Sequence, residues 1–215
     1  MLYQVFKELF MIQNNKKVLG VILAGGLSKR MKGENKFFKK INNKTIIEHI
    51  ILKASQQVTK LIINANINKS KFKKFDLDII KDSVKGFKGP LAGILSAMQY
   101  GKKNNFKWLV TLPCDAPFFP FDLVNKLLKN AEKKKCKIVI AKSNNRTHPV
   151  IGIWSISLKK SLSNTLIREN IKKIDLFIKK HKFSIVNFSY DKIDPFFNIN
   201  SYRDLEKAKK YQLDN

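Results

Sequence analysis

The chain alternates short apolar, strand-like runs with stretches that carry an apolar face at helical spacing, and this alternation limits the folds open to it. Several runs are apolar throughout, as in strands covered on both faces of a sheet. Seven strands are predicted, at Val18–Ala24, Lys60–Asn64, Leu77–Ile80, Trp108–Leu112, Ile138–Ala141, Val150–Ser155 and Phe183–Phe188. Strands that alternate with helices favour an α/β fold with a mostly parallel sheet wrapped by helices.

Three stretches between these strands place apolar side chains three and four residues apart, which is typical of amphipathic helices. Their apolar faces are Ile46, Ile47, Ile50, Ile51 and Ala54; Leu91, Ile94, Leu95 and Met98; and Leu123, Val124, Leu127, Leu128 and Ala131. A last helix is expected to begin near Ser201, because Asp204 three residues later resembles a capping box. A length of 215 residues suits one core. We expect one domain over 17–215 and an N-terminal extension over 1–16.

The N-terminal extension does not resemble a secretory signal. Met1–Phe10 has apolar residues at helical spacing but neither a basic start nor a small-residue cleavage site. No apolar run is long enough to cross a bilayer. Without a signal peptide, Cys114 and Cys136 indicate free thiols in a reducing cytoplasm, and no zinc-type ligand spacing is present.

The net charge of +27 suggests two readings, a nucleic-acid or membrane-surface binder, or a chain rich in lysine for compositional reasons. Of the 43 basic residues, 39 are lysine and 4 are arginine, and they are spread along the chain. Base reading and bidentate phosphate contacts favour arginine. We therefore expect no nucleic-acid and no membrane partner, although the charge should attract anionic substrates.

The first predicted strand runs into a glycine turn, Leu23-Ala24-Gly25-Gly26, which Arg30 and Lys36 follow. Glycines let backbone N–H groups approach a phosphate or a base closely, and the two cations add fixed positive charge. The turn matches neither a Walker A loop nor a dinucleotide fingerprint. The alternative is a plain strand-to-helix turn with solvated lysines.

A second glycine segment, Gly89-Pro90-Leu91-Ala92-Gly93, opens a predicted helix. Pro90 suits the first helical turn, and the small residues would let the backbone come near a ligand. A plain helix start is the alternative.

Asp115 follows the apolar strand Trp108–Leu112, and Pro113 and Pro117 stiffen the chain on both sides of it. A carboxylate held at the carboxyl end of a strand is well placed to bind Mg²⁺ against phosphates. Cys114 has no base partner in view and is read as a small buried hydrophobe.

The segment LAGGLSKRMKGENK resembles the LAGG-x3-RM-x-G-x2-K signature of molybdenum cofactor guanylyltransferases. Further matches follow in the family's order: Asn64-Ala65-Asn66, Asp82, Gly89–Gly93, Pro113–Pro117, His148-Pro149 and Phe196–Asn200. The resemblance covers nearly all of the chain after residue 17 and implies a single-domain, Rossmann-like three-layer α/β/α nucleotidyltransferase fold. Lys32 stands where the family usually has glycine, and Asn35 where it usually has aspartate.

The resemblance also implies a role for each matched residue. The nucleotide-binding residues would be Leu23, Ala24, Gly25, Gly26, Lys36, Asn64, Asp82, Gly89 and Asp115. The catalytic residues would be Arg30, Lys36 and Asp115, with Asp115 also holding Mg²⁺; Asn198 and Asn200 would bind the acceptor. Asp82 could accept bonds from the guanine edge or from the ribose. Alternatives remain for Asn64 as a turn residue and for Asn200 as a helix cap, while His148 and Asp194 are read as structural.

The function implied is transfer of GMP from GTP to molybdopterin with release of pyrophosphate, with a molybdoenzyme chaperone as a further partner. One alternative is a related enzyme, such as a molybdopterin cytidylyltransferase or a sugar-phosphate nucleotidyltransferase, although these usually carry alanine where this chain has Gly26. The other is a basic nucleic-acid-binding protein, which leaves the ordered motifs unexplained.

Overall fold

The computed structural model describes residues 17–25, 36–66, 69–84, 86 and 89–211. In chain order the elements are β1 (Val18–Leu23), η1 (Lys36–Phe38), β2 (Lys40–Ile41), β3 (Lys44–Thr45), α2 (Ile46–Ser55), β4 (Lys60–Asn64), η2 (Lys69–Phe75), β5 (Asp78–Ile80), α3 (Pro90–Lys103), β6 (Trp108–Pro113), α4 (Leu123–Lys134), β7 (Ile138–Ser143), β8 (Arg146–Ser155), η3 (Ile156–Leu158), α5 (Lys159–Ile167), α6 (Ile174–Lys179), β9 (Phe183–Asn187) and α7 (Tyr202–Lys209). The predicted helical turns in Met1–Phe10 lie outside the described residues.

Seven strands form one sheet in the order β5-β4-β1-β6-β8-β7-β9, and a mostly parallel sheet is thereby confirmed. Among the described strands of this sheet, β8 alone runs antiparallel to its neighbours. The reversal has a local cause: the loop between β7 and β8 is Asn144-Asn145, and both residues have positive φ. Two-residue hairpin loops require that conformation, which asparagine tolerates. β8 therefore begins at Arg146, four residues before the predicted start at Val150.

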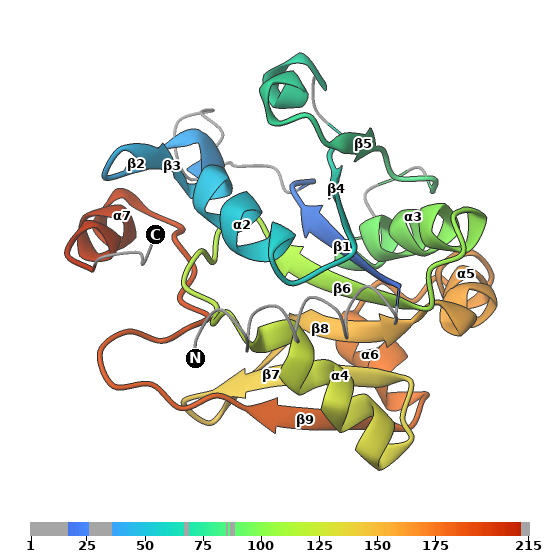
Figure 1. The fold of residues 1–215 in the computed structure, drawn as a ribbon. Helices are drawn as coiled ribbons and strands as arrows, with labels where there is room; N and C mark the ends of the chain where they lie inside the picture. The colour runs from blue at the N-terminus through green and yellow to red at the C-terminus, as the bar shows by residue number, and fades with distance from the viewer. Residues whose placement is uncertain (1–16, 26–35, 67–68, 85, 87–88, 212–215) are drawn as a thin grey trace.

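Helices cover both faces of the sheet, giving three layers (Figure 1). One apolar core joins the sheet to α2, α4 and α7, and the other joins it to α3, α5 and α6. In β1 the side chains alternate between the two, since Val18 and Ile22 belong to the first core and Leu19 and Val21 to the second. Burial on both faces explains why this strand is apolar throughout.

Several elements were not predicted from the sequence pattern: the β2–β3 hairpin, η1, η2, η3, α5 and α6. The hairpin and η1 have two or three residues per element, too few to show a hydrophobic repeat. Helix η1 is nevertheless important for the site, because Lys36 is its first residue. Helix α2 begins directly after the hairpin, where Thr45 forms a capping box with Glu48. Among the helices of the described residues, none combines the length and the apolar character needed to cross a bilayer.

The strand order reverses next to β1. The chain passes from β1 to β4 and β5 on one side and then returns to β6 on the other side of β1. Leu23, at the end of β1, pairs with Asn64 of β4 and with Pro113 of β6. In open α/β sheets, ligands bind outside the carboxyl ends of the strands at such a switch point. The loops after β1, β4 and β6 therefore define the edge where a site is expected.

Helix α2 packs against η1, which begins with Lys36, and Glu48 in α2 allows a pH test of the stability of this region. Burial raises the pKa of Glu48, but hydrogen bonds from Lys74 and Thr45 outweigh this effect and lower the pKa from 4.5 to about 2. The carboxylate therefore stabilises the fold above pH 4.5, and this contribution is lost as the pH falls through about 2. Glu48→Gln keeps an oxygen for the capping box and removes the charge. We expect a lower melting temperature than wild type at neutral pH and a difference that shrinks in acid.

The matched control is Glu206→Gln, because Glu206 also pairs with a lysine, Lys209, but lies on the exposed side of α7. An exposed pair contributes little to stability, so this variant should melt close to wild type at every pH. If the melting-temperature difference between Glu48→Gln and wild type stayed constant from neutral to acid pH, the charge of the Glu48 carboxylate would not be the cause of the stabilisation.

Candidate functional site

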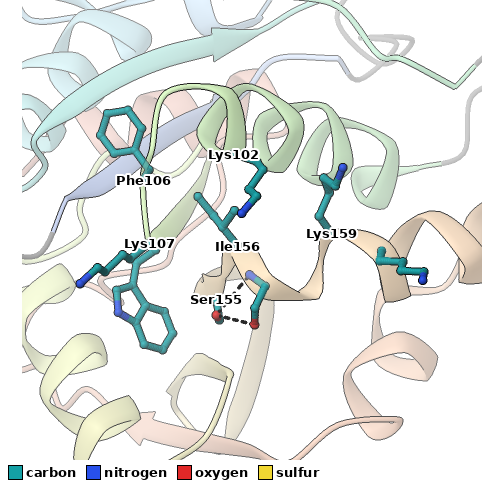
Figure 2. A pocket seen from close by; sticks show the side chains of 9 residues that line it. Lys102, Phe106, Lys107, Ser155, Ile156 and Lys159 are labelled. Carbon is teal, nitrogen blue, oxygen red and sulfur yellow. Dashed lines mark hydrogen bonds between the residues drawn. The ribbon is translucent and has the colours of Figure 1, made fainter.

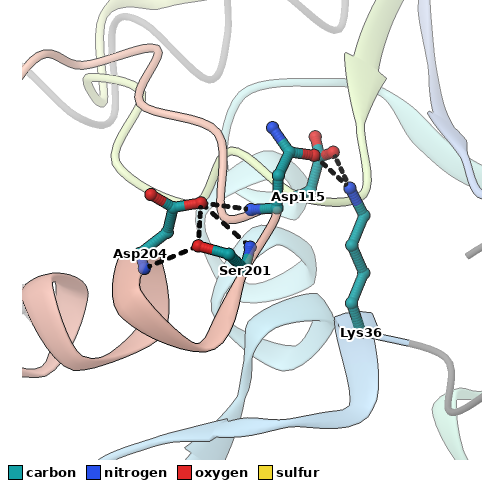
Figure 3. Close-up of polar contacts among 5 residues, drawn as sticks. Lys36, Asp115, Ser201 and Asp204 are labelled. Atoms are coloured by element: carbon teal, nitrogen blue, oxygen red, sulfur yellow. Dashed lines mark hydrogen bonds and ion pairs between the residues drawn. The ribbon is translucent and has the colours of Figure 1, made fainter. Parts of the chain in front are cut away.

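Three side chains from distant parts of the chain meet at the carboxyl edge of the sheet (Figure 3). The Lys36 ammonium donates to Asp115 Oδ2 at 2.5 Å and to Asn200 Oδ1 at 2.7 Å. The side chains of Lys36 and Asp115 are each 17% exposed, so the cluster is largely shielded and still open to a ligand. The structure thus brings together residues predicted for phosphate, metal and acceptor binding.

Backbone hydrogen bonds explain why Asp115 and Asn200 converge. Asp115 comes just after β6, and the amide of Cys114 bonds the carbonyl of Leu23 at 3.3 Å, which joins this turn to the end of β1. The amide of Ile199 bonds the Asp115 carbonyl at 2.9 Å and so places Asn200 beside the carboxylate. The main chain therefore places Asp115 and Asn200 side by side, and Lys36 joins them through its side chain.

Asn200 does not cap the last helix. Ser201 is the N-cap of α7 and forms the capping box with Asp204, as predicted for that pair. Asp204 Oδ2 also accepts the backbone N–H of Asn200 at 3.0 Å. The alternative of a capping role for Asn200 is wrong, because its side-chain oxygen is directed to Lys36 instead.

Cys114 lies beside the cluster without being part of its chemistry. Burial raises the pKa of the Cys114 thiol to about 12, and the neighbouring Asp115 charge acts in the same direction. A thiol with this pKa is not a nucleophile at neutral pH. Both Cys114 and Cys136 are buried free thiols, as the sequence predicted.

A second polar cluster lies at the ends of β4 and β5. Asn64 donates to Asp82 Oδ1 at 3.0 Å, and Asn66 donates to Asp82 Oδ2 at 2.8 Å. Asn66 Oδ1 also accepts the backbone N–H of Asp82 at 2.9 Å. Asn64 is the last residue of β4, is buried, and anchors Asp82, so it does more than end a strand. Asn66 was missing from the predicted site, although its two-residue spacing from Asn64 is a usable signal.

The two glycines that begin α3 have different structural roles. Gly89 is the N-cap and has φ of 68°, a conformation that glycine adopts without strain. A Cβ atom at Gly93 would lie 2.3 Å from Asn64 Oδ1 and 2.9 Å from Leu23 Cδ2. The space at Gly93 is thus filled by Asn64, which corrects the expectation that this glycine admits a ligand.

For the other predicted residues the structure shows no side-chain hydrogen bond to the two clusters, or does not describe them. Leu23 is the last residue of β1, Ala24 and Gly25 follow it, and the amide of Ala24 bonds the Asn64 carbonyl at 2.8 Å. Gly26 and Arg30 lie outside the described residues, as do the departures Lys32 and Asn35. The Asn198 side chain is half-buried and has no hydrogen bond to any residue in the described part of the chain.

A hollow of about 560 Å³ lies at the opposite edge of the sheet, where β6 begins and β8 ends (Figure 2). It is lined by Lys102, Phe106, Lys107, Trp108, Ser155, Ile156, Ser157, Lys159 and Lys160. None of the predicted site residues lines it, and Asp115 follows the other end of β6. The hollow is separate from the candidate site.

Comparison with known proteins assigns the family. A model of the MobA-like NTP transferase domain matches residues 20–182. A molybdenum cofactor guanylyltransferase of Nitrobacter hamburgensis is 36% identical over 193 residues, which are 89% of this chain and 92% of the relative. One from Bradyrhizobium is 35% identical over 90% of this chain and 92% of the relative. The chain belongs to the molybdenum cofactor guanylyltransferase family.

Solved structures agree with this family assignment. Molybdopterin-guanine dinucleotide biosynthesis protein A of Archaeoglobus fulgidus superposes with a TM-score of 0.73 at 26% identity, covering 90% of this chain and 97% of that one. The Rossmann-like three-layer nucleotidyltransferase fold is therefore confirmed, and a molybdenum cofactor guanylyltransferase is a nucleotidyltransferase enzyme.

Gly93 gives a test of the second polar cluster in this guanylyltransferase. In Gly93→Ala the new methyl group must displace the Asn64 amide, because the two would lie 2.3 Å apart. The family resemblance predicts that Asp82 binds the nucleotide. On that prediction, breaking the Asn64–Asp82 hydrogen bond should weaken nucleotide binding by roughly 3- to 10-fold, the scale of one hydrogen bond. Isothermal titration of wild type and variant measures the change.

A double-mutant cycle with Asn64→Ala provides the control. If Gly93→Ala acts through Asn64, it should have little further effect on nucleotide affinity once Asn64 is already alanine. Independent, additive effects of the two changes would show that Gly93 does not act by way of the amide.

Proposed function

We propose that this protein transfers GMP from GTP to molybdopterin, forming molybdopterin guanine dinucleotide and releasing pyrophosphate. The observation that carries the proposal is the convergence of Lys36, Asp115 and Asn200 at the carboxyl ends of β1 and β6. The names of the relatives that are about 35% identical over some nine tenths of the chain support the substrate assignment.

In this proposal the nucleotide lies along the switch point of the sheet. The backbone of Leu23, Ala24 and Gly25, continued by Gly26, would contact the guanine nucleotide, and Gly89 would contribute from the start of α3. Asp82 would bind either the guanine edge or the ribose. Asn64 and Asn66 already bond both carboxylate oxygens of Asp82, so this carboxylate is fixed before a ligand arrives.

A divalent metal is typical of nucleotidyltransferases, and we propose Mg²⁺. The described residues contain no cluster of three or more His, Cys, Asp and Glu side chains that would form an all-protein metal site. Mg²⁺ needs few protein ligands, because it keeps waters and takes phosphate oxygens from its substrate. Asp115 Oδ2 and Asn200 Oδ1 fit it, since both oxygens already face one cation, the Lys36 ammonium. Bound there, Mg²⁺ would neutralise charge on the reacting phosphates.

The chemical step needs positioning more than proton transfer. The terminal phosphate of molybdopterin attacks the α-phosphorus of GTP, a new P–O bond forms, and the bond to the β-phosphate breaks as pyrophosphate leaves. The nucleophile is already an anion, so no strong general base is required. Lys36 would move from Asp115 to the triphosphate oxygens, and Arg30 would neutralise the leaving pyrophosphate.

The acceptor would lie along the segment that precedes α7. Asn198 and Asn200 would hydrogen-bond the molybdopterin phosphate, and Asn200 would do so beside Asp115. The hydrogen bond from Lys36 to Asn200 supports this placement. It brings the segment proposed for the acceptor next to the lysine that is proposed to bind the triphosphate.

The choice of nucleotide separates this proposal from the related cytidylyl enzymes. Incubation with Mg²⁺ and molybdopterin should release pyrophosphate from GTP, and from CTP or ATP much more slowly. Omission of molybdopterin should stop the release, which excludes simple hydrolysis. Equal use of CTP and GTP would contradict the guanylyl assignment, although the fold would stand.

Asp115→Asn tests the metal-binding role. The change keeps the size of the side chain and an oxygen that can accept from Lys36, so the protein should fold; its melting temperature should be somewhat lower, because the shielded ammonium loses its counter-charge. Turnover should fall by roughly 10²-fold or more, the scale of losing one preorganised electrostatic contact. GTP affinity should also lose most of its Mg²⁺ dependence. Pyrophosphate release and calorimetry with and without Mg²⁺ measure both effects.

Asp175→Asn is the matched control, because it removes an exposed carboxylate in α6. Its turnover should equal that of wild type. Near-wild-type turnover of folded Asp115→Asn would place the metal elsewhere and leave the Pro113–Pro117 turn with a structural role only.

We also propose that the reaction takes place in the cytoplasm, where the free thiols would stay reduced. GTP and molybdopterin are the proposed partners. A molybdoenzyme chaperone that receives the product remains a prediction from family resemblance.

A further inference from the structure

A chain of hydrogen bonds joins the β7–β8 hairpin to the segment that precedes α7. Ser143, the last residue of β7, donates its hydroxyl to Asp194 Oδ1 at 2.7 Å. His148 Nε2, in β8, lies 2.8 Å from the same Ser143 oxygen. Asp194 Oδ1 also accepts the backbone N–H of Phe196 at 2.8 Å. Three side chains outside the Lys36–Asp115–Asn200 cluster are thus linked to the main chain of the acceptor segment.

The direction of each hydrogen bond follows from the number of hydrogens available. The Ser143 hydroxyl has one hydrogen, which it gives to Asp194 Oδ1, so it can only accept from His148. His148 must therefore carry a hydrogen on Nε2. Burial lowers the pKa of His148, with the Arg146 charge acting in the same direction and Asp194 opposing it, which favours the neutral ring. The order is then His148 to Ser143 to Asp194, with Phe196 as a second donor to the carboxylate.

The same three residue types form nucleophilic triads in hydrolases, but this arrangement is different. Ser143 is fully buried, and its hydrogen goes to the carboxylate rather than to the imidazole. In a triad the histidine lies between the serine and the aspartate, whereas here the serine lies between the other two. The geometry therefore indicates a structural link rather than a nucleophile.

Aromatic packing strengthens the link. The His148 ring lies 4.9 Å from the ring of Phe196, and Phe196 packs edge-on against Phe188 at 5.3 Å. Phe196 is buried, so the segment is held from the side of the hairpin by both polar and apolar contacts.

The segment is anchored again a few residues later. The amide of Phe197 bonds the Asp194 carbonyl at 3.0 Å, and the amide of Ile199 bonds the Asp115 carbonyl at 2.9 Å. Asn198 lies between these two anchors, and Asn200 follows the second. A shift at Asp194 would therefore reach Asn198, four residues later, and Asn200, six residues later.

We propose that Ser143, His148 and Asp194 are positioning residues that hold the segment 194–200 in the conformation in which Asn198 and Asn200 bind the acceptor phosphate. This inference rests on the proposed function for the identity of the acceptor. It assigns no contact with substrate to the three residues, and it gives a specific task to His148 and Asp194, which the sequence indicated only as structural.

The test uses the full-length protein with Ser143→Ala, which removes the central link, and two variants of His148. His148→Phe keeps a ring against Phe196 but cannot donate, whereas His148→Gln keeps an amide donor. We expect Ser143→Ala and His148→Phe to raise the KM for molybdopterin by about 10-fold while the KM for GTP changes by less than about twofold, as expected when only one substrate's binding groups are misplaced. His148→Gln should lie closer to wild type. His148 is only half-buried, so its variants serve if Ser143→Ala does not fold.

Ser161→Ala is the matched control, because the hydroxyl of Ser161 in α5 also bonds a histidine, His181, at 3.1 Å. Helix α5 packs in the opposite core from Phe196 and Ile199 of the segment. The variant should leave both KM values unchanged.

Hydrogen–deuterium exchange provides a readout that does not depend on activity. The amides of Phe196 and Ile199 should exchange faster in Ser143→Ala than in wild type and Ser161→Ala. Unchanged exchange, or faster exchange with an unchanged KM for molybdopterin, would overturn the inference. If wild type fails to use molybdopterin with GTP, the proposed function is wrong, and the exchange rates alone then decide whether the hydrogen-bond chain orders the segment.

Discussion

The contact of the Lys36 ammonium with Asp115 and Asn200 is the interaction on which the organisation of the site depends. It joins the start of η1, the turn after β6 and the segment before α7, which are separated by up to 164 residues in sequence. Charged groups that are largely removed from water are costly unless they are paired and hydrogen-bonded. The ammonium and the carboxylate satisfy each other here, so neither charge is left unpaired in the partly shielded cluster.

Two further carboxylates beside the site, both half-buried, are also satisfied by hydrogen bonds. Asp82 is held by two asparagines, and Asp194 is held by Ser143 and a backbone amide. Each of these carboxylates lies where a loop leaves the carboxyl end of a strand or joins the acceptor segment. The sheet fixes the backbone, and these local networks fix the loops that it leaves at its edge.

Much of this arrangement was predictable from the sequence. The strands covered on both faces are largely apolar, so β1, β4 and β6 could be located to within one residue. The residues at their carboxyl ends indicated the site: the glycine turn after β1, Asn64 at the end of β4 and Asp115 after β6. The reversed direction of β8 could not be read from its apolar run, since it depends on the backbone conformation of Asn144 and Asn145. Ser143 gave no signal, because a single serine after an apolar run is ordinary. Its role arises only when the fold brings Asp194 to it from 51 residues away.

The occupancy of Asp115 by Lys36 has a consequence for the order of events in the proposed reaction. A free divalent ion that arrived alone would have to expel the ammonium and leave it with no anion in exchange. A nucleotide that carries the ion offers the ammonium its own phosphate oxygens in the same event. If Asp115 holds the ion as proposed, one cation would replace another at the carboxylate, and the site would favour the metal–nucleotide complex over the bare metal.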